Sequence, residues 1–208
     1  MEGDITKKKL TQLIVVLGLL IVPANILAND LRVAEFTKIR MDYAKRADFD
    51  PGWERHADRG QITDLWDNNK IDEGVELAKQ WLKKHPVDAQ MHLWYAFFLW
   101  EKGDFQGSFR HKFFYQGLLA SITSSGSGLS SDSPMKVISV SEEYSVLKAL
   151  NAKLIRQSLT TCKSGIPCDA MECEMGEEQV TWYFDISISM DHINKMLNPE
   201  AEKKKAPK

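Results

Sequence analysis

The chain has 208 residues, a formal net charge of −2 and 43% apolar residues, which is the composition of a folded domain and excludes a disordered polymer. The near-neutral charge also argues against a general nucleic-acid binder, which needs a basic face, although local basic patches remain compatible with it.

The N-terminus has the pattern of a secretory signal peptide, and we assign residues 1–28 to it. A lysine cluster at 7–9 precedes an apolar core, Leu13–Val22, which as a helix would span about 15 Å, too short for a hydrocarbon core of roughly 30 Å. The small residues Ala24 and Ala28 follow, so we expect cleavage after Ala28, or failing that after Ala24. The alternative is an uncleaved anchor. We therefore expect a periplasmic or extracellular protein that meets a membrane only through this segment before cleavage.

Residues 29–123 read as a helical part. The spacing of apolar residues predicts an amphipathic helix over 31–46. Pro51 and two glycines predict a loop over 48–60, with Trp53 packed on the core, or else exposed as part of an interaction element.

From Ile62 onwards the pattern is helix, short turn with Pro86, helix, Gly103–Asp104 turn, helix, which is the arrangement of one tetratricopeptide-like unit. One unit is too little for a long concave groove, so we expect a compact helical part. The stretch LWYAFFLW (93–100) is apolar all round, which predicts a buried helix. An aromatic cofactor or sugar site there is the alternative.

Residues 124–197 read as an α+β part packed on the helices, and 198–208 as a flexible charged tail. A Ser-Gly loop over 124–135 is followed by a strand over 135–140 and a short helix, with Ser141 as N-cap and two glutamates in its first turn. Alternation predicts strands over 152–159, 169–175 and 179–189, with a tight turn at Gly176–Glu177 and a final half-helix. The predicted fold class is α+β, with tetratricopeptide-like helices followed by a small, mostly antiparallel sheet with one short helix.

The chain has three cysteines, Cys162, Cys168 and Cys173. Their spacing fits no standard zinc site, so we expect no metal. The turn-prone segment KSGIP separates the first two, which predicts a Cys162–Cys168 disulfide in an oxidising compartment. Alternation with Met171 and Met175 predicts a buried free thiol at Cys173.

Several segments resemble an uncharacterised family of small bacterial secreted proteins, the domain of unknown function 4919. The segments are SSGSG (124–128), KVISVSEEYSVL (136–147), YFDIS (183–187), FTKIR (36–40) and the run from GDF to FYQGLL (103–119). The resemblance covers nearly all of the chain after residue 28. It implies the helical front, the closing strand and export, but no chemistry, and the three cysteines are not part of its pattern.

The best candidates for chemistry are His111, Glu143, Tyr144 and Asp185, with Glu142 beside them. A histidine near carboxylates could perform acid–base work; the alternative is that the glutamates cap a helix and the others are structural. The Ser-Gly loop lacks the lysine of a phosphate-binding loop, and no G-x-S-x-G occurs. We therefore expect an exported binding, interaction or structural module with an unknown protein or small ligand as partner, no nucleic acid and no cofactor. The alternative is a small exported hydrolytic enzyme using His111 with Glu143.

Overall fold

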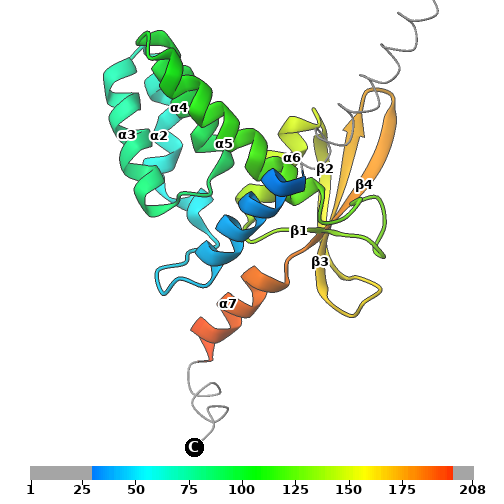
Figure 1. Ribbon diagram of the computed structural model, residues 1–208. Coiled ribbons are helices and arrows are strands. Elements are labelled where there is room, and N and C mark those ends of the chain that lie inside the picture. Colours follow the sequence, from blue (N-terminus) through cyan, green and yellow to red (C-terminus); the bar gives the residue numbers. More distant parts are fainter. Residues whose placement is uncertain (1–29, 199–208) are drawn as a thin grey trace, which may run out of the picture.

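The computed structural model describes residues 30–198 and has the predicted α+β architecture. Helices lead the chain and the sheet follows, with one helix of the second part lying between them (Figure 1). The predicted signal peptide and all but the first residue of the predicted tail lie outside the described residues. Within them, no helix combines the length and the apolarity needed to cross a membrane.

The helical part begins with a helix over 30–44, close to its predicted range. One 3-10 turn and four further α-helices follow: η1 (Trp53–Arg55), α2 (Ala57–Asp67), α3 (Ile71–Lys84), α4 (Ala89–Glu101) and α5 (Phe105–Thr123). The last two begin at aspartates whose carboxylates accept backbone N–H groups: Asp88 accepts from Met91 N at 3.1 Å, and Asp104 accepts from Gly107 N at 2.8 Å. Gly103 supplies the positive φ of 79° that the turn between them requires.

Two expectations for the helical part need correction. Helix α2 begins at Ala57, inside the predicted loop; Gly60 costs the helix about 1 kcal/mol, which the burial of Ile62 in the core offsets. Helix α4 is not buried all round: Phe97 and Trp100 are 42% and 50% exposed, because α3 and α5 cover only part of its surface. Trp53, in contrast, is fully buried, as expected.

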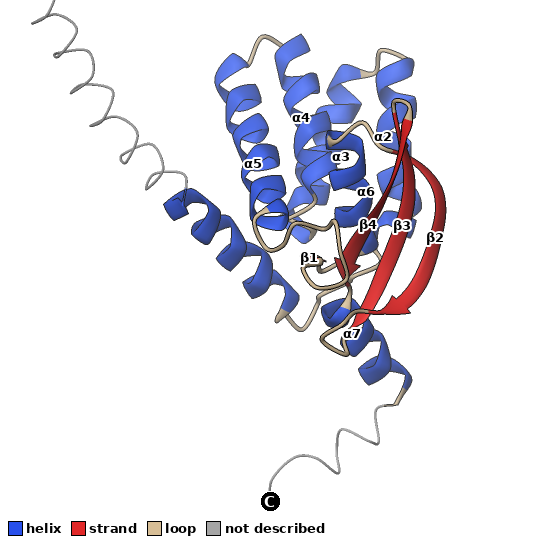
Figure 2. Ribbon diagram, turned by 90° about the vertical axis from the view of Figure 1, so that its right-hand side faces the viewer, coloured by secondary structure: helices blue, strands red, loops and turns tan. Residues whose placement is uncertain are grey.

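The sheet has the strand order β1-β4-β3-β2. Its strands are β1 (Met135–Lys136), β2 (Lys153–Thr161), β3 (Pro167–Met175) and β4 (Glu178–Asp185). The pair β1–β4 is parallel and the other two pairs are antiparallel, so the sheet is mostly antiparallel as predicted (Figure 2). Helix α6 (Val140–Ala149) precedes β2, and α7 (Ser187–Leu197) follows β4. The apolar cluster beside the sheet combines residues of α5, α6, β3 and β4, such as Ile122, Val146, Met171 and Phe184.

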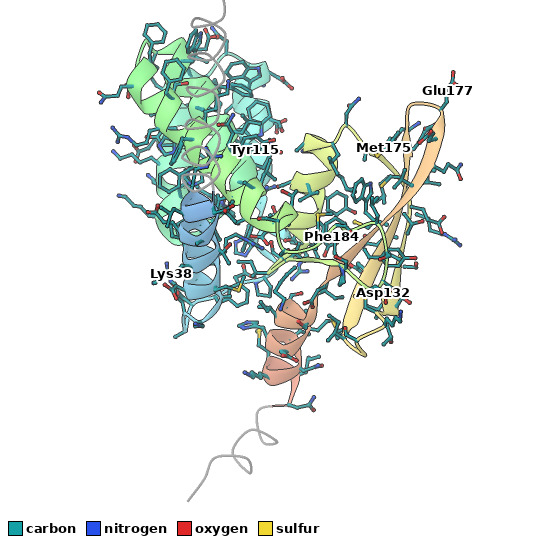
Figure 3. The ribbon with its side chains drawn as sticks, turned by 45° about the vertical axis from the view of Figure 1, so that its right-hand side comes forward. Lys38, Tyr115, Asp132, Met175, Glu177 and Phe184 are labelled. Carbon is teal, nitrogen blue, oxygen red and sulfur yellow. A yellow bond between two sulfur atoms is a disulfide. The ribbon has the colours of Figure 1, made fainter. Side chains whose placement is uncertain are left out.

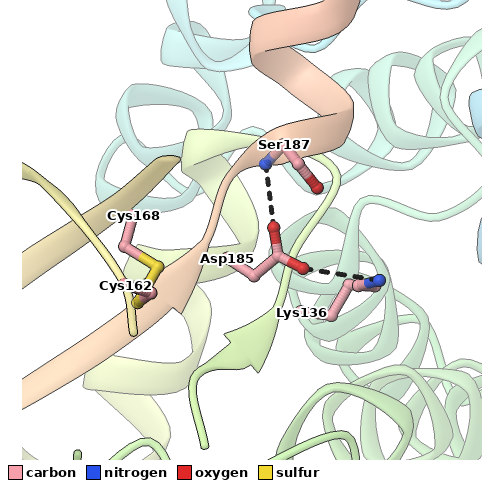
Figure 4. Close-up of a disulfide and its surroundings, with 5 residues drawn as sticks. All are labelled: Lys136, Cys162, Cys168, Asp185 and Ser187. Atoms are coloured by element: carbon pink, nitrogen blue, oxygen red, sulfur yellow. Dashed lines mark hydrogen bonds and ion pairs between the residues drawn. A yellow bond between two sulfur atoms is a disulfide. The ribbon is translucent and has the colours of Figure 1, made fainter. Parts of the chain in front are cut away.

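Three boundaries in the second part differ from the prediction. The strand expected over 135–140 has only two residues, because Ser139, not Ser141, is the N-cap of α6 and its Oγ accepts from Glu142 N at 3.2 Å. The strand expected over 179–189 ends at Asp185. There the Asp185 carboxylate accepts Ser187 N at 3.0 Å and turns the chain into α7 (Figure 4).

The predicted disulfide joins Cys162 to Cys168 across the β2–β3 turn, with the Cα atoms 5.7 Å apart (Figure 4). Gly165 has a φ of 83° in that turn. Cys173 is a buried free thiol, as expected, and burial raises its pKa.

The Ser-Gly loop is an ordered part of the sheet edge and not a phosphate cradle. Gly128 N donates to Ser133 O at 2.8 Å within the loop, and Gly128 O accepts from Tyr183 N of β4, also at 2.8 Å. Gly128 has a φ of 69°, and a Cβ on Gly126 would lie 2.2 Å from Pro134 O. The glycines therefore serve a tight turn and a close backbone approach.

A buried ion pair joins the two parts of the fold. Arg40 and Glu142 are 1% and 2% exposed. Arg40 Nε donates to Glu142 Oε1 at 2.7 Å, and Arg40 Nη2 donates to Glu142 Oε2 at 2.5 Å. The same guanidinium donates to Ser121 Oγ of α5 and to Lys136 O of β1, while Glu142 Oε2 also accepts Ile138 N at 2.9 Å. The pair thus connects the first helix, α5, β1 and α6.

Replacing Arg40 by methionine should strongly destabilise the fold, because Glu142 then stays buried without its cation. The expected loss in the free energy of unfolding is about 3–5 kcal/mol, measured by urea denaturation. Lys38→Met is the matched control, since Lys38 lies on the same helix with its side chain 76% exposed (Figure 3); it should change stability little. Equal effects of the two substitutions would contradict the assigned role of the pair.

Candidate functional site

A hollow of about 190 Å³ lies between the 51–55 segment, α6, the β2–β3 strands and α7. Its walls are mostly apolar, and two carboxyl groups, Glu143 of α6 and Asp169 of β3, also line it. The apolar lining residues include Val140, Leu159, Ile186, Met190 and Ile193. An apolar hollow with a few polar groups is the usual form of a small-ligand site.

Glu143 is fully buried, and neither of its carboxylate oxygens accepts a hydrogen bond from another residue. Its position follows from the geometry of α6. Successive residues of a helix are about 100° apart around its axis, so once Glu142 is held by Arg40, Glu143 faces a different direction. That direction leads into the hollow.

Asp169 is the second carboxyl group of the site and is 7% exposed. It accepts a hydrogen bond from Gln157 Nε2 at 2.6 Å, and Tyr144, one residue after Glu143, reaches Gln157 Oε1 with its hydroxyl at 3.4 Å. The Tyr144 hydroxyl thereby favours the orientation in which the Gln157 amide donates to Asp169. Two of the sequence candidates, Glu143 and Tyr144, are therefore connected through two residues that sequence reasoning missed.

The two carboxyl groups do not both ionise easily. Burial, and then the neighbouring Asp169, Glu54 and Glu142 carboxylates, raise the pKa of Glu143 to about 9. Burial also raises the pKa of Asp169, while the hydrogen bond from Gln157 lowers it. Two carboxylates have no proton to share, so a hydrogen bond between them forms only when one is protonated. At neutral pH the proton resides on Glu143 and Asp169 accepts.

Arg55 lines the same hollow from the 51–55 segment. Its side chain is 73% exposed, and its Nη1 lies 3.6 Å from Glu54 Oε1. A Cβ on Gly52 would lie 2.0 Å from Arg55 Nη2, so the absence of a side chain at Gly52 leaves room for the guanidinium. The basic group therefore lies near solvent, and the carboxyl pair lies deeper.

The structure does not bring His111 and Glu143 into one site. His111 lies on α5, where its Nδ1 is 2.8 Å from Nδ1 of His92, and the Nε2 of His92 lies 3.0 Å from Pro86 O. His92 Nε2 must donate to that carbonyl, so its Nδ1 accepts from His111. Burial and the neighbouring His92 lower the pKa of His111 to about 4, which keeps the pair neutral. Glu143 shares none of these neighbours.

Asp185 and Glu142 have structural partners. The Asp185 carboxylate lies 3.4 Å from Lys136 Nζ and accepts a hydrogen bond from Ser187 N, the first residue of α7 (Figure 4), and Glu142 is held by Arg40. Among residues 30–198 no group of three or more histidine, cysteine, aspartate or glutamate side chains is placed to hold a metal ion.

A second hollow, of about 310 Å³, lies beside α3. It is lined by Trp81, Lys83, Lys84, His56 and His85. Its histidines already have partners: His85 Nδ1 lies 2.9 Å from the Tyr43 hydroxyl, and His56 Nε2 lies 2.7 Å from Asp50. The hollow beside Glu143 is therefore the stronger candidate, because no donor of the protein reaches the buried Glu143 oxygens.

The family model of the domain of unknown function (DUF4919) matches residues 30–195. The chain belongs to this family. The match includes every residue that lines the hollow beside Glu143. No curated protein and no solved structure matches the chain significantly. Membership in the family confirms the predicted relationship, and any chemical role has to be argued from the geometry of the site.

A protonated carboxyl group beside an accepting carboxylate can donate a proton or bind a cation in its place. Ser189, the hydroxyl residue in the hollow, donates to Ile186 O at 3.0 Å and has no base beside it among the hydrogen bonds of the described residues. The carboxyl pair therefore offers groups for binding or for proton transfer, and Ser189 is not activated by a neighbouring base among the described residues.

The raised pKa of Glu143 makes stability depend on pH. The folded state holds a proton that the unfolded chain releases above about pH 4.5, so the free energy of unfolding should fall as pH rises from 5 to 9. The fall contributed by one such proton is up to about 1.4 kcal/mol per pH unit.

The variant Glu143→Gln cannot titrate, and its amide can still donate to Asp169. Urea denaturation between pH 5 and 9 should show a weaker dependence on pH, and higher stability than the wild type at the alkaline end. The control is Glu177→Gln at the exposed β3–β4 turn (Figure 3), which should follow the wild type. Parallel curves for all three proteins would contradict the buried proton.

Proposed function

We propose that this chain is an exported binding module that holds a small ligand in the hollow beside Glu143. The observation that carries the proposal is a fully buried carboxyl group, Glu143, whose oxygens accept no hydrogen bond and which lines a mostly apolar cavity together with Asp169. A buried polar group without a partner costs free energy. Such a group is retained most readily where a ligand completes its hydrogen bonds.

The helical part serves in this proposal as a scaffold, of which α3 and α4 form a tetratricopeptide-like pair. Arg59 of α2 donates to Asp88 Oδ2 at 2.7 Å and to Ser141 Oγ of α6 at 3.1 Å. Asp88 itself is fully buried and caps α4. These contacts support α6 from the helical side and keep Glu143 directed at the hollow.

Hydrolysis by His111 with Glu143 is the weaker alternative. It needs both side chains within hydrogen-bond reach of one substrate, and the neutral His92–His111 pair lies among Tyr95 and Phe114. The carboxyl pair alone favours binding.

Export rests on the pattern of residues 1–28 and agrees with the Cys162–Cys168 disulfide, which is typical of an oxidising compartment. Mass spectrometry of the protein from its own host should find Asn29 as the first residue. An intact N-terminus at Met1 would overturn export as proposed.

Binding in the hollow is tested by NMR with labelled methyl groups. Neutral, cationic and anionic fragments of up to about ten non-hydrogen atoms fit a cavity of this size, and some of them should shift the methyl signals of Ile186, Met190 and Ile193. The variant Leu159→Trp should abolish these shifts, because Leu159 is 65% exposed and lines the hollow, so that an indole there fills its opening.

Ile155→Trp is the matched control: Ile155 lies on the same strand, is 52% exposed and does not line the hollow. It should leave the shifts unchanged. Shifts that gather at other methyl groups, or that survive Leu159→Trp, would overturn the proposed site.

A further inference from the structure

We infer that the ligand of this hollow carries an organic ammonium or guanidinium head, which lies against Glu143 and Asp169, and a short aliphatic body. This inference rests on the proposed function and adds the chemical class of the ligand. The inference rests on which buried carboxylates have basic partners, on the hydrogen-bonding capacity and charge of the site, and on the size and walls of the hollow.

The buried carboxylates of the described residues fall into two groups. Three of them form an ion pair with a basic side chain: Asp88 with Arg59, Glu142 with Arg40 and Asp185 with Lys136. Glu143 and Asp169 have none among the ion pairs of residues 30–198, although they are only 0% and 7% exposed. They are also the two that share a hollow. A cationic ligand would supply this pair with the positive charge that a basic side chain supplies to each of the other three carboxylates.

The hydrogen-bonding capacity of the site favours a donor without acceptors. Neither oxygen of Glu143 accepts a hydrogen bond from another residue, and Oε2 of the adjacent Glu54 is buried without a donor as well. An ammonium group has three N–H donors and no acceptor, so it satisfies such oxygens fully. A hydroxyl group supplies one donor, and a ligand carboxylate would meet like charges.

The charged groups that face Glu143 leave the base of the hollow negative. Asp169, Glu54 and Glu142 all act on Glu143 as neighbouring negative charges. Glu142 is neutralised by Arg40, and Arg55 is turned towards solvent beside Glu54. With one proton shared between Glu143 and Asp169, the pair keeps one negative charge for a cation. Binding of the cation should therefore favour the form in which both carboxyl groups are ionised, so that on average a fraction of a proton is released to the buffer.

The size and walls of the hollow define the rest of the ligand. A volume of about 190 Å³ is smaller than the roughly 300–1,000 Å³ of sites for drug-sized ligands. It has room for one long side chain or a short alkyl amine. The walls, which include Val140, Met190 and Ile193, favour a chain of methylene groups.

The test is isothermal titration calorimetry at pH 7.5 with four probes: butylammonium, hexylammonium, hexan-1-ol and hexanoate. Hexylammonium should bind most tightly, and each added methylene should strengthen binding by up to about fourfold, as expected for its burial. Its binding heat should vary with the ionisation enthalpy of the buffer, because Glu143 releases its proton. A residue with a merely structural role would not produce this dependence.

Glu143→Gln and Asp169→Asn should each weaken hexylammonium binding at least tenfold, and Glu143→Gln should remove the dependence on buffer. Glu177→Gln is the control and should bind as the wild type does. Two variants of the site are used so that a folding defect in one does not decide the result, and circular dichroism confirms that each is folded.

Tighter binding of hexanol or hexanoate than of hexylammonium, or equal binding by wild type and both site variants, would overturn the cationic ligand. Absence of binding by all four probes would overturn it too. None of these three results decides whether the hollow binds ligands, because the fragment experiment with Leu159→Trp and Ile155→Trp tests that independently.

Discussion

The buried pair of Arg40 and Glu142 is the contact on which the rest of this structure depends. It joins the first described helix to α6 and, through the same guanidinium, to Ser121 and Lys136. A buried ion pair contributes little net stability, because removing both charges from water costs about as much as their attraction returns. It does define one arrangement, since any other packing of α6 would leave a charge buried without its partner.

Fixing α6 has a direct consequence for the next residue. Glu143 is held in a buried position where no donor reaches its oxygens, and the Gln157 side chain holds Asp169 in the same hollow. The result is a carboxyl pair that destabilises the fold at neutral pH. Natural sequences depart from local rules of this kind mainly at functional sites, and for that reason we place the ligand there and not beside α3.

Much of the fold could be predicted because it depends on local patterns. The strand β3, the KSGIP turn and the Cys162–Cys168 disulfide follow from a few neighbouring residues, and the structure confirms them. The predictions that were wrong depend on distant contacts. The sequence predicted Ser141 as the N-cap of α6, but Arg59, eighty-two residues before it, donates to its hydroxyl, and Ser139 caps the helix instead.

Only part of the candidate site could be predicted from the sequence. Glu143 and Tyr144 were candidates because they lie together in a recognisable segment. Asp169 was missed, although alternation with Met171 and Cys173 places this charged residue on a face with buried residues, which was the available signal. The pairing of His111 with Glu143 could not be judged from the sequence, because only the fold shows that α5 holds His111 against His92.

The central claim is that Glu143 carries a proton at neutral pH and faces an open hollow. Carbon-13 NMR of the glutamate side-chain carboxyl groups, assigned with Glu143→Gln and followed from pH 4 to 10, tests it most directly. We predict that the Glu143 signal stays in its protonated position through pH 7 and moves only near pH 9, and that hexylammonium shifts its titration to lower pH. A Glu143 signal that titrates below pH 5, as for an exposed glutamate, would contradict the account.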